Sequence, residues 1–556
     1  MFKIQKAIVL LLKQGPTKFV RTIVSKKKEK KKIIEFKNKA RNIHLISEEE
    51  RERQRKWEFQ NCRKFSIITP LYNTPVEYLI ELLESVERQT YTNWELCLAD
   101  GSDDKHEYVE KVCKDWMNRD NRIIYMKLKK NLGISNNTNE CLKLASGDFF
   151  GLLDHDDVLH ESALFEMMCV IEKTEADFIY SDEVKFSKEI SDATDFNFKS
   201  AFGKDELRSH NYICHFTVFS KELLENANEL YRSNFDGSQD HDMVLRLTER
   251  AKNIVHIPKV LYYWRVHPDS VSMNLDSKSY AVDAAIRAIK EQLIRENEHG
   301  SVSSNLPYRT IYRISYDILQ HPKVIILVHN NSNLQIDEIK PRIDNNTSYD
   351  NYEIIFVEIK ENETLGIALN RDISHNKADF YVLFDGACIP ENDDWIEEML
   401  MYAQRNDVCT VSPKILFGNN LIGYAGLALD ANEKGFIKFL GKGFSDDEQG
   451  YEAMFRYVRN ITASWKGCCM ISAEKLRMMG GFSEDMDGYE EVDFSLRGIQ
   501  NKLWNVWTCF AKINYDSMEI PSFEEKKSKI FYNRWQDEIK KGDRYYHPIL
   551  KELRWL

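Results

Sequence analysis

The sequence predicts an α/β fold made of two tandem copies of one plan, preceded by a basic helical arm. Four segments of the first half recur in the same order roughly 230 to 260 residues further along the chain, which chance does not explain. Within each copy, short apolar runs alternate with helical patterns, and this alternation predicts mostly parallel central sheets with helices on both faces. The matching segments are 65–73 with 324–331, 93–100 with 351–358, 131–157 with 364–389, and 236–247 with 487–498.

The length of 556 residues gives each copy enough chain for its own core, since a domain needs roughly 150 residues. The expected parts are a basic helical arm and linker over 1–60, a first α/β domain over 61–300, a second over 301–525 and a helical tail over 526–556. The polar stretch 47–56 reads as linker. The helices expected in the first copy are 76–88, 136–144 and 160–171.

Charge is distributed unevenly along the chain. The net charge is -11, but residues 1–41 carry 14 Lys and Arg against Glu29 and Glu35, so an arm of +12 precedes a body of -23. An acidic body argues against nucleic acid as a partner, and the basic arm points to an anionic surface.

The arm has the pattern of an interfacial helix. Ile4, Ile8, Leu11 and Leu12 follow helical spacing among lysines, which suits peripheral contact with the inner face of a cell membrane. A solvated basic helix, or a tail that docks on the acidic body, is the alternative. No apolar run reaches 18 residues, and eleven cysteines without a CxxC pair read as reduced thiols of a cytoplasmic protein rather than a disulfide or zinc framework.

An acidic cluster follows the apolar run 149–153. In doubly wound sheets ligands bind at the carboxyl ends of the strands, so this cluster should lie at the site. Asp154 and Asp156, one residue apart, can both reach Mg²⁺ or Mn²⁺, which prefer oxygen ligands shared with phosphate. Asp157 fits a polar turn that caps the following helix.

The phosphates have no glycine-rich cradle in this sequence. The first strand runs into "TPLYNTP", so a nucleotide would be held by a metal and by side chains. Asp100, in "LADGSDD" after the second strand, is placed to accept hydrogen bonds from a base or ribose. An ordinary Asp-Gly turn is the alternative for Asp100.

Six ordered motifs together resemble family 2 glycosyltransferases of the GT-A fold, a Rossmann-like fold, and in particular the two-domain bacterial enzymes of rhamnan-type surface polysaccharides. The resemblance covers about residues 64–556 and implies transfer of a sugar from a UDP- or dTDP-linked donor to a growing glycan or lipid-linked glycan. It also implies an inverting, Mn²⁺- or Mg²⁺-dependent reaction. The motifs are "SIITPLYNTP", "LADGSDD", "NLGISNNTN", "LLDHDDVL", "SQDHDMVLRL" and "YYWRVHPDSVS".

The resemblance assigns roles to individual residues of the first copy. Pro70, Tyr72 and Asp100 would line the nucleotide pocket, and Asp154 and Asp156 would match the family's DxD metal motif. These assignments place the donor at the ends of the first two apolar runs and of the run 149–153.

The catalytic base would be Asp240, with Asp242 as a close competitor, in a motif where Gln239 replaces the usual Glu. An inverting transfer needs such a base opposite the departing diphosphate. Acids that merely stabilise a helix N-terminus are the alternative for both. His267 would ligate the metal or donate to the leaving phosphate.

Two further acids, Asp182 and Glu183 in "SDEVKF", resemble the same subgroup. We expect them to contact the sugar or the acceptor.

The second copy departs from the pattern. Asp385 survives, but Ala387 occupies the position of Asp156 and Glu358 replaces Asp100, so the DxD motif is degenerate. The segment 487–498 nevertheless keeps the acids Glu490, Glu491 and Asp493. This half is either a second transferase with an altered metal site or a retired copy that holds glycan or organises the first, and we favour the second.

Two rival functions belong to other classes. A sugar nucleotidyltransferase would show a glycine-rich basic loop after the first strand, which "TPLYNTP" is not. A non-catalytic glycan-binding protein would not need the intact acidic cluster of the first copy. Hydrolysis of a nucleotide-sugar donor would distinguish an enzyme from a non-catalytic glycan-binding protein.

Overall fold

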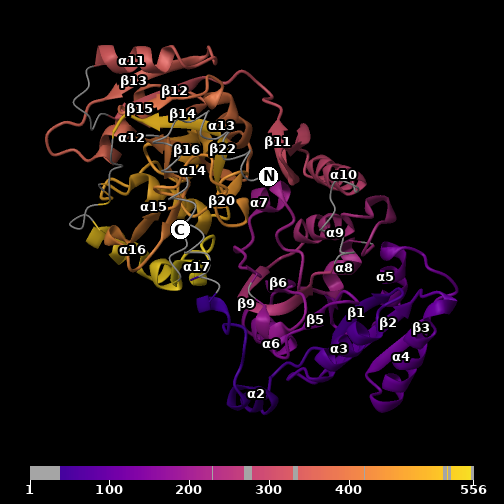
Figure 1. The fold of residues 1–556 in the computed structure, drawn as a ribbon. Coiled ribbons are helices and arrows are strands. Elements are labelled where there is room, and N and C mark those ends of the chain that lie inside the picture. Colours follow the sequence, from indigo (N-terminus) through magenta and orange to yellow (C-terminus); the bar gives the residue numbers. More distant parts are fainter. Residues whose placement is uncertain are drawn as a thin grey trace, which may run out of the picture.

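The computed structural model describes residues 35, 38–193, 195–227, 229–267, 279–329, 336–418, 420–486, 488–517, 523 and 528–552. The apolar pattern expected for an interfacial helix at 4–12 lies outside these residues. Two α/β units lie side by side, the first drawn from indigo to magenta and the second from orange to yellow in Figure 1. Among the described residues, no helix is both long enough and apolar enough to cross a membrane.

The first unit is built on a nine-stranded sheet with the order β3-β2-β1-β4-β8-β6-β9-β5, and β7 pairs with β6. Its strands are β1 (Phe65–Leu71), β2 (Trp94–Asp100), β3 (Ile123–Lys127), β4 (Phe149–Leu152), β5 (Val158–Leu159), β6 (Phe178–Phe186), β7 (Asp195–Asn197), β8 (Thr217–Ser220) and β9 (Ile254–Arg265). Its helices are α3 (Val76–Glu87), α4 (Tyr108–Arg119), α5 (Ile134–Leu142), α6 (Ala163–Thr174), α7 (Lys204–Ser209), α8 (Lys221–Ala227), α9 (Gln239–Thr248) and α10 (Ser279–Arg295).

The second unit repeats this plan. Its order β13-β12-β14-β21-β16-β22-β15 matches β2-β1-β4-β8-β6-β9-β5 of the first unit strand for strand, which confirms the two tandem copies. Its strands are β12 (Val324–His329), β13 (Tyr352–Val357), β14 (Phe380–Asp385), β15 (Cys388–Pro390), β16 (Val408–Phe417), β17 (Leu421–Tyr424), β20 (Arg459–Ile461), β21 (Cys468–Ser472) and β22 (Trp504–Tyr515). Its helices are α11 (Ile336–Asp344), α12 (Leu365–His375), α13 (Trp395–Ala403), α14 (Ala473–Met478) and α15 (Glu490–Gln500).

Each sheet is mixed rather than mostly parallel. Strands β1 to β4 pair in parallel, whereas β8 runs antiparallel to both β4 and β6. The second sheet has the same reversal, because β21 is antiparallel to β14 and β16. The predicted nucleotide-pocket residues and the acidic residues 154–157 lie at the carboxyl ends of strands in the parallel part of the first sheet.

Local sequence explains why the expected helices form. Helix α3 begins after Pro75, whose fixed φ suits a helix start, and its apolar residues lie on one face. Leu79, Leu82, Leu83 and Val86 are fully buried in a core shared with β1 and β2. The predicted helices 76–88, 136–144 and 160–171 correspond to α3, α5 and α6 within a few residues.

The stretch 47–56, expected as linker, is largely helical. It contains helix α2 (Glu48–Arg55), which Ser47 caps by accepting a hydrogen bond from the Glu50 amide. The Arg51 guanidinium binds Glu161 of the first unit at 2.6 Å, and the Thr90 hydroxyl donates to Gln54. Ion pairs three residues apart and this docking stabilise a helix that has almost no apolar face.

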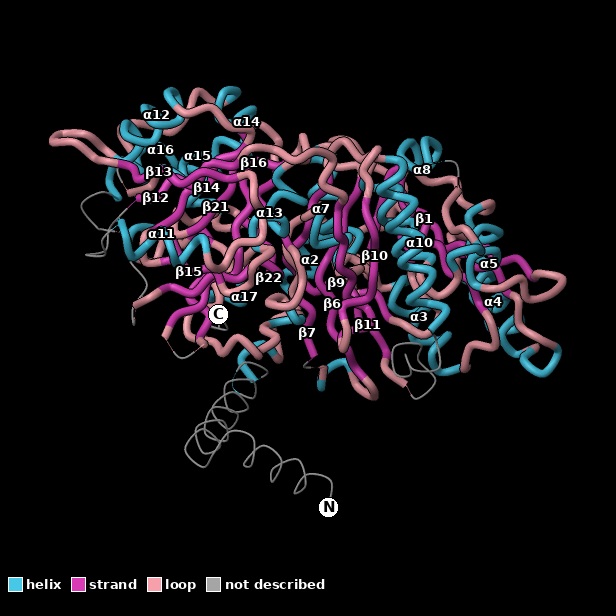
Figure 2. The backbone as a smooth tube through the Cα atoms, turned by 90° about the horizontal axis from the view of Figure 1, so that it is seen from above, coloured by secondary structure: helices cyan, strands magenta, loops and turns pink. Residues whose placement is uncertain are grey.

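Helix α7 joins the two units. It lies between them with β10 (Gly300–Asn305) and β11 (Tyr308–Tyr316), as Figure 2 shows. Asp205 of α7 forms an ion pair with Arg405 and accepts a hydrogen bond from Asn460, both of the second unit. Because these groups are buried, separating the units would leave the Asp205 carboxylate without its ion-pair partner Arg405.

The C-terminal segment that contains α16 (Ser528–Lys541) and α17 (Pro548–Glu552) contacts both units. Trp535 and Arg534 of α16 donate to Asp493 of the second unit. Just before α17, His547 lies 2.9 Å from Asp182 of the first unit. The tail therefore bridges the molecule.

Candidate functional site

The carboxyl ends of β1, β2 and β4 meet at one edge of the first sheet. Leu71 pairs with Asp100 across β1 and β2, and the acidic residues 154–157 follow β4 directly. Pro70 is buried in β1, whereas Tyr72, just beyond it, is 44% exposed. The structure thus brings the predicted donor residues of three strands to one edge, as expected for a parallel arrangement.

Asp100 is more enclosed than the sequence suggested. Its carboxylate is fully buried and accepts hydrogen bonds from the Ser102 amide, the Tyr125 hydroxyl and the Lys127 ammonium at 2.7, 2.8 and 2.9 Å. Burial acts to raise the pKa of Asp100, but the hydrogen bonds from Ser102 and Lys127 outweigh it and leave the pKa below its usual range. The last two donors come from β3, which no sequence motif marked.

The loop 131–137 packs on the same strand end. A Cβ at Gly101 would lie 3.0 Å from the side chain of Asn137 and 3.2 Å from the backbone of Asn131, so a larger residue there would have to push this loop outward. The side-chain carbonyl oxygen of Asn131 accepts from Gly133 and Asn137. The motifs "LADGSDD" and "NLGISNNTN" therefore pack against each other.

Asp157 is turned inward and does not cap α6. Its two carboxylate oxygens accept from the Tyr262 hydroxyl at 2.6 Å and the Arg265 amide at 2.7 Å, while α6 begins six residues later behind Ser162. The capping prediction for Asp157 is therefore wrong. Burial raises the pKa of Asp157, and the negative charges of Asp156 and Asp154 raise it further.

Asp154 and Asp156 face different imidazoles. Nε2 of His267 lies 2.9 Å from Oδ2 of Asp156, and Nε2 of His215 lies 3.5 Å from Oδ2 of Asp154. The Asp154 side chain is 53% exposed, whereas Asp157 already has both oxygens in hydrogen bonds. Asp154, Asp157 and His215 offer ligand atoms that all lie within 4.8 Å of one another, and two carboxylates with an imidazole fit Mn²⁺ or Mg²⁺.

His215 is a site residue that the sequence did not reveal. It precedes β8, stacks on Tyr262 with ring centroids 4.8 Å apart, and lies 3.3 Å from the Glu183 carboxylate. Lys199 holds Glu183 from the other side at 3.1 Å. Burial opposes ionisation of Glu183, but the charge of Lys199 prevails and lowers its pKa to about 2.

Asp182 lies on the opposite face of β6. It is buried and accepts from His256 at 2.8 Å and from His547 at 2.9 Å, so it cannot meet sugar or acceptor as expected. Successive residues of a strand point to opposite faces, and only Glu183 faces the acidic cluster.

Asp240 and Asp242 occupy different environments on α9. The Asp240 carboxylate is half-buried, accepts from the Asn211 amide at 2.9 Å, and lies 3.5 Å from the Cys214 thiol next to His215. Asp242 is fully buried between Arg232 and Arg246, the second at 3.0 Å. Asp240 is the one that borders the cluster around His215.

Comparison with known proteins points to one family. The family model described as glycosyl transferase family 2 matches residues 66–227. A GalNAc(5)-diNAcBac-PP-undecaprenol beta-1,3-glucosyltransferase of Campylobacter jejuni is 30% identical over 237 residues, which cover 39% of this chain and 70% of that protein. The chain belongs to glycosyltransferase family 2.

Longer relatives of this glycosyltransferase match both units. The O-antigen biosynthesis protein RfbC of Myxococcus xanthus is 27% identical over 524 residues, or 87% of this chain, and an uncharacterised protein of Sinorhizobium fredii is 29% identical over 507 residues, or 84%. The chain spans 40% and 55% of their respective lengths. Among solved structures, Staphylococcus aureus TarS 1-349 is similar at a TM-score of 0.34 and 18% identity, over 42% of this chain and 65% of TarS.

The second unit of the glycosyltransferase reproduces the α9 arrangement. Glu490 accepts from the Gly488 amide at 3.0 Å as Gln239 does from the Gly237 amide at 2.8 Å. Asp493 pairs with Arg497, four residues later, as Asp242 pairs with Arg246. By this correspondence Glu491 stands where the first unit has Asp240.

Unlike Asp240, Glu491 is fully enclosed. Neither of its carboxylate oxygens has a hydrogen-bond partner within the part of the chain that the structure describes. Burial raises the pKa of Glu491 to about 7 against the attraction of Lys466, which pairs with Glu490 at 3.1 Å. Asp385 is also buried and accepts from the Ala387 amide at 2.9 Å.

The buried Glu491 predicts a loss of stability as the pH rises. The unfolded chain ionises near the ordinary pKa of 4.5 and the folded protein only near 7, so stability falls between these values by about 3 kcal/mol and the loss is complete above 7. Urea unfolding at pH 5 and pH 8 measures the difference. Glu491→Gln should remove that part of it, and an unchanged pH dependence in the variant would contradict the assignment.

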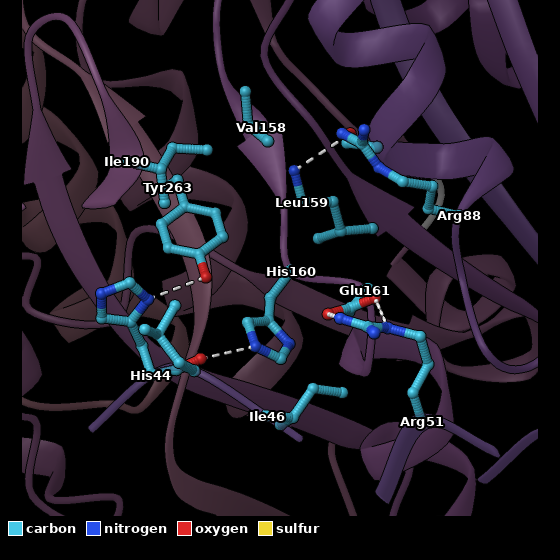
Figure 3. A pocket seen from close by; sticks show the side chains of 12 residues that line it. His44, Ile46, Arg51, Arg88, Val158, Leu159, His160, Glu161, Ile190 and Tyr263 are labelled. Atoms are coloured by element: carbon cyan, nitrogen blue, oxygen red, sulfur yellow. Dashed lines mark hydrogen bonds and ion pairs between the residues drawn. The ribbon is translucent and has the colours of Figure 1, made fainter. Parts of the chain in front are cut away.

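A separate cavity of about 330 Å³ lies between residues 44–46 and β5 (Figure 3). His160 Nε2 lies 2.8 Å from the His44 carbonyl oxygen, and Tyr263 lies 3.0 Å from the His44 ring. None of the acids of the predicted site lines this cavity. At its edge Arg51 forms an ion pair with Glu161. The cavity therefore lies where residues 44–51 dock on the first unit.

Proposed function

We propose that the first unit transfers a sugar from a nucleotide diphosphate donor to a cell-envelope glycan, with inversion at the transferred carbon. The observation that carries this is the placement of Asp240, a half-buried carboxylate beside the cluster of Asp154 and His215, while Asp242 is locked between two arginines. A single displacement requires a base for the acceptor hydroxyl and a separate group that stabilises the leaving diphosphate. Asp240 and the acidic residues 154–157 can fill these two roles.

In this reaction Asp240 takes the proton of an acceptor hydroxyl, whose oxygen then bonds to the anomeric carbon of the donor sugar. The bond from that carbon to the diphosphate breaks, and the nucleoside diphosphate leaves with the bonding electrons. Asn211 fixes the Asp240 carboxylate through its 2.9 Å hydrogen bond. The exposed Tyr72 and the buried Pro70 border the space for the nucleotide.

A divalent cation, Mn²⁺ or Mg²⁺, would be held by Asp154 and Asp156, with His267 beside Asp156. When bound, it would neutralise charge on the departing diphosphate. His267 also orients Asp156 from behind, as imidazoles and carboxylates do around metals. The donor set supports this cofactor without choosing between the two cations.

The names of relatives support the choice of acceptor. They include proteins of O-antigen and minor teichoic acid biosynthesis and a transferase that acts on an undecaprenol-linked glycan. We infer a glycan or lipid-linked glycan acceptor and a UDP- or dTDP-linked donor. The charge of the basic arm supports work at the cytoplasmic face of the membrane.

A donor screen tests the proposal. Nucleotide sugars are incubated with the protein with and without Mn²⁺, and the released nucleoside diphosphate is measured. Release of nucleoside diphosphate, with the sugar transferred to an acceptor or to water, supports a glycosyltransferase. Release of pyrophosphate would indicate a nucleotidyltransferase. Release from no donor would overturn the proposal and favour a glycan-binding protein.

Asp156→Ala should abolish the Mn²⁺-dependent turnover. The side chain is 23% exposed and pairs with the partly exposed His267, so unfolding should change little while the response to Mn²⁺ is lost. Asp104→Ala, which removes an exposed carboxylate at the same end of the sheet, is the control and should behave as wild type. Normal Mn²⁺-dependent turnover in Asp156→Ala would remove the metal assignment.

A further inference from the structure

A polar ledge continues outward from the acidic cluster along β6, β7 and β9. On one face of these strands Glu183 pairs with Asn197 and Tyr262, and two residues further on Lys185 pairs with Asp195 and Trp264. Since residues two apart share a face, the second row lies about 7 Å beyond the first. The first row supports His215, so the second row borders the site on its outer side.

The second row combines an aromatic ring with hydrogen-bonding groups. Trp264 is half-buried, with its ring centroid 5.1 Å from that of His215, and the Lys185 ammonium lies 4.8 Å from the same indole. Asp195 is exposed on the neighbouring strand. An indole edge flanked by an ammonium and carboxylates offers both an apolar surface and partners for hydroxyl groups.

The second unit supplies the outer wall of this ledge. Tyr451 donates its hydroxyl to the Phe196 carbonyl at 2.7 Å and accepts from the Phe198 amide at 2.9 Å, which anchors its loop on β7. The next residue, Glu452, is exposed and interacts electrostatically with Lys185, Asp195 and Glu183 of the first unit. β6, β7 and β9 lie in the middle of the molecule, at its border with the second unit (Figure 2).

We propose that Trp264, Lys185, Asp195 and, from the second unit, Glu452 form the binding site for the acceptor sugar of the first unit. The inference rests on the proposed function and specifies its acceptor. Asp195 and Glu452 carry two negative charges against one on Lys185, so the ledge repels phosphate and accepts an uncharged sugar ring. The second unit thus completes the site at which the first unit works.

This arrangement explains how the two units cooperate. Donor residues come only from the first unit, at the ends of β1, β2 and β4, whereas the acceptor ledge needs a loop more than 250 positions away. Glu452 lies on the acceptor side and has no contact with the donor residues among those described. Its loss should therefore weaken acceptor binding without changing donor binding.

Saturation-transfer NMR with uncharged methyl glycosides of glucose, galactose, N-acetylgalactosamine and rhamnose tests the ledge on the full-length protein. At least one glycoside should bind, glycerol 3-phosphate should not, and Trp264→Ala should weaken binding by about tenfold or more. Glu452→Ala should weaken it as well, and this exposed position separates loss of binding from loss of fold. Gln449→Ala, an exposed change in the same loop, is the matched control and should leave binding unchanged.

Binding of glycerol 3-phosphate but of no glycoside, or glycoside binding that survives both Trp264→Ala and Glu452→Ala, would overturn the proposal. Binding of none of these compounds would overturn it too. Release of nucleoside diphosphate from donor in water is measured in parallel. It reports on the donor site alone, so a failure of the ledge and a failure of the proposed activity are told apart.

Discussion

Asp240→Asn is expected to lower kcat by about 10² to 10⁴-fold, which is what a positioned general base contributes. Asparagine keeps the size of the side chain and can still accept the hydrogen bond from Asn211, but it cannot take a proton. Steady-state release of nucleoside diphosphate in the presence of acceptor measures the effect. The urea midpoint should be unchanged, because the half-buried carboxylate has no ion-pair partner among the described residues.

The same variant separates base catalysis from donor binding. Affinity for the nucleoside diphosphate should remain within a fewfold of wild type, since Asp240 lies on α9 and the donor residues lie at the strand ends. A turnover within tenfold of wild type would show that another group accepts the proton.

Asp242→Ala is expected to destabilise the first unit by about 3–5 kcal/mol, the usual cost of removing one partner of a buried ion pair. Arg246 would remain almost completely buried without this acid, and Arg232 would be left with Glu291 at 2.8 Å. Urea unfolding of the full-length protein measures the change. Asp493→Ala makes the matching change in the second unit, where Arg497 and Trp535 lose their acceptor.

The activities of Asp240→Asn and Asp242→Ala together show which of the two acids is the base. A well-folded but inactive Asp242→Ala, together with an active Asp240→Asn, would make Asp242 the base. A destabilised Asp242→Ala whose remaining folded fraction is fully active supports Asp240 as the group that accepts the proton.

The repeat made most of the fold predictable. Four paired segments give the positions of β1, β2, β4 and α9 and of their counterparts in the second unit, and the strand orders agree. The antiparallel β8 and β21 could not be predicted, because a short apolar run does not encode the direction of its neighbour. Helix α2 was missed because its stability comes from ion pairs and docking rather than from an apolar face.

The site was predictable only where residues cluster in sequence. The acids at 154–157 and 240–242 stand out because several carboxylates follow a strand or begin a helix. His215 has no such neighbours, and only the pairing of β8 with β4 brings it to Asp154. Lys127 likewise meets Asp100 through the pairing of β2 with β3, and Lys199 meets Glu183 just beyond the pairing of β6 with β7, which a single sequence does not reveal.

The bridge from His547 to Asp182 has a consequence for biosynthesis. The two residues are 365 positions apart, so at a translation rate of roughly 5–20 residues per second Asp182 emerges about 20 to 70 s before its partner. During that interval the Asp182 carboxylate has His256 and the Lys199 amide as partners within the first half but lacks His547. Assembly of the whole molecule is therefore completed only after nearly all of this chain has left the ribosome.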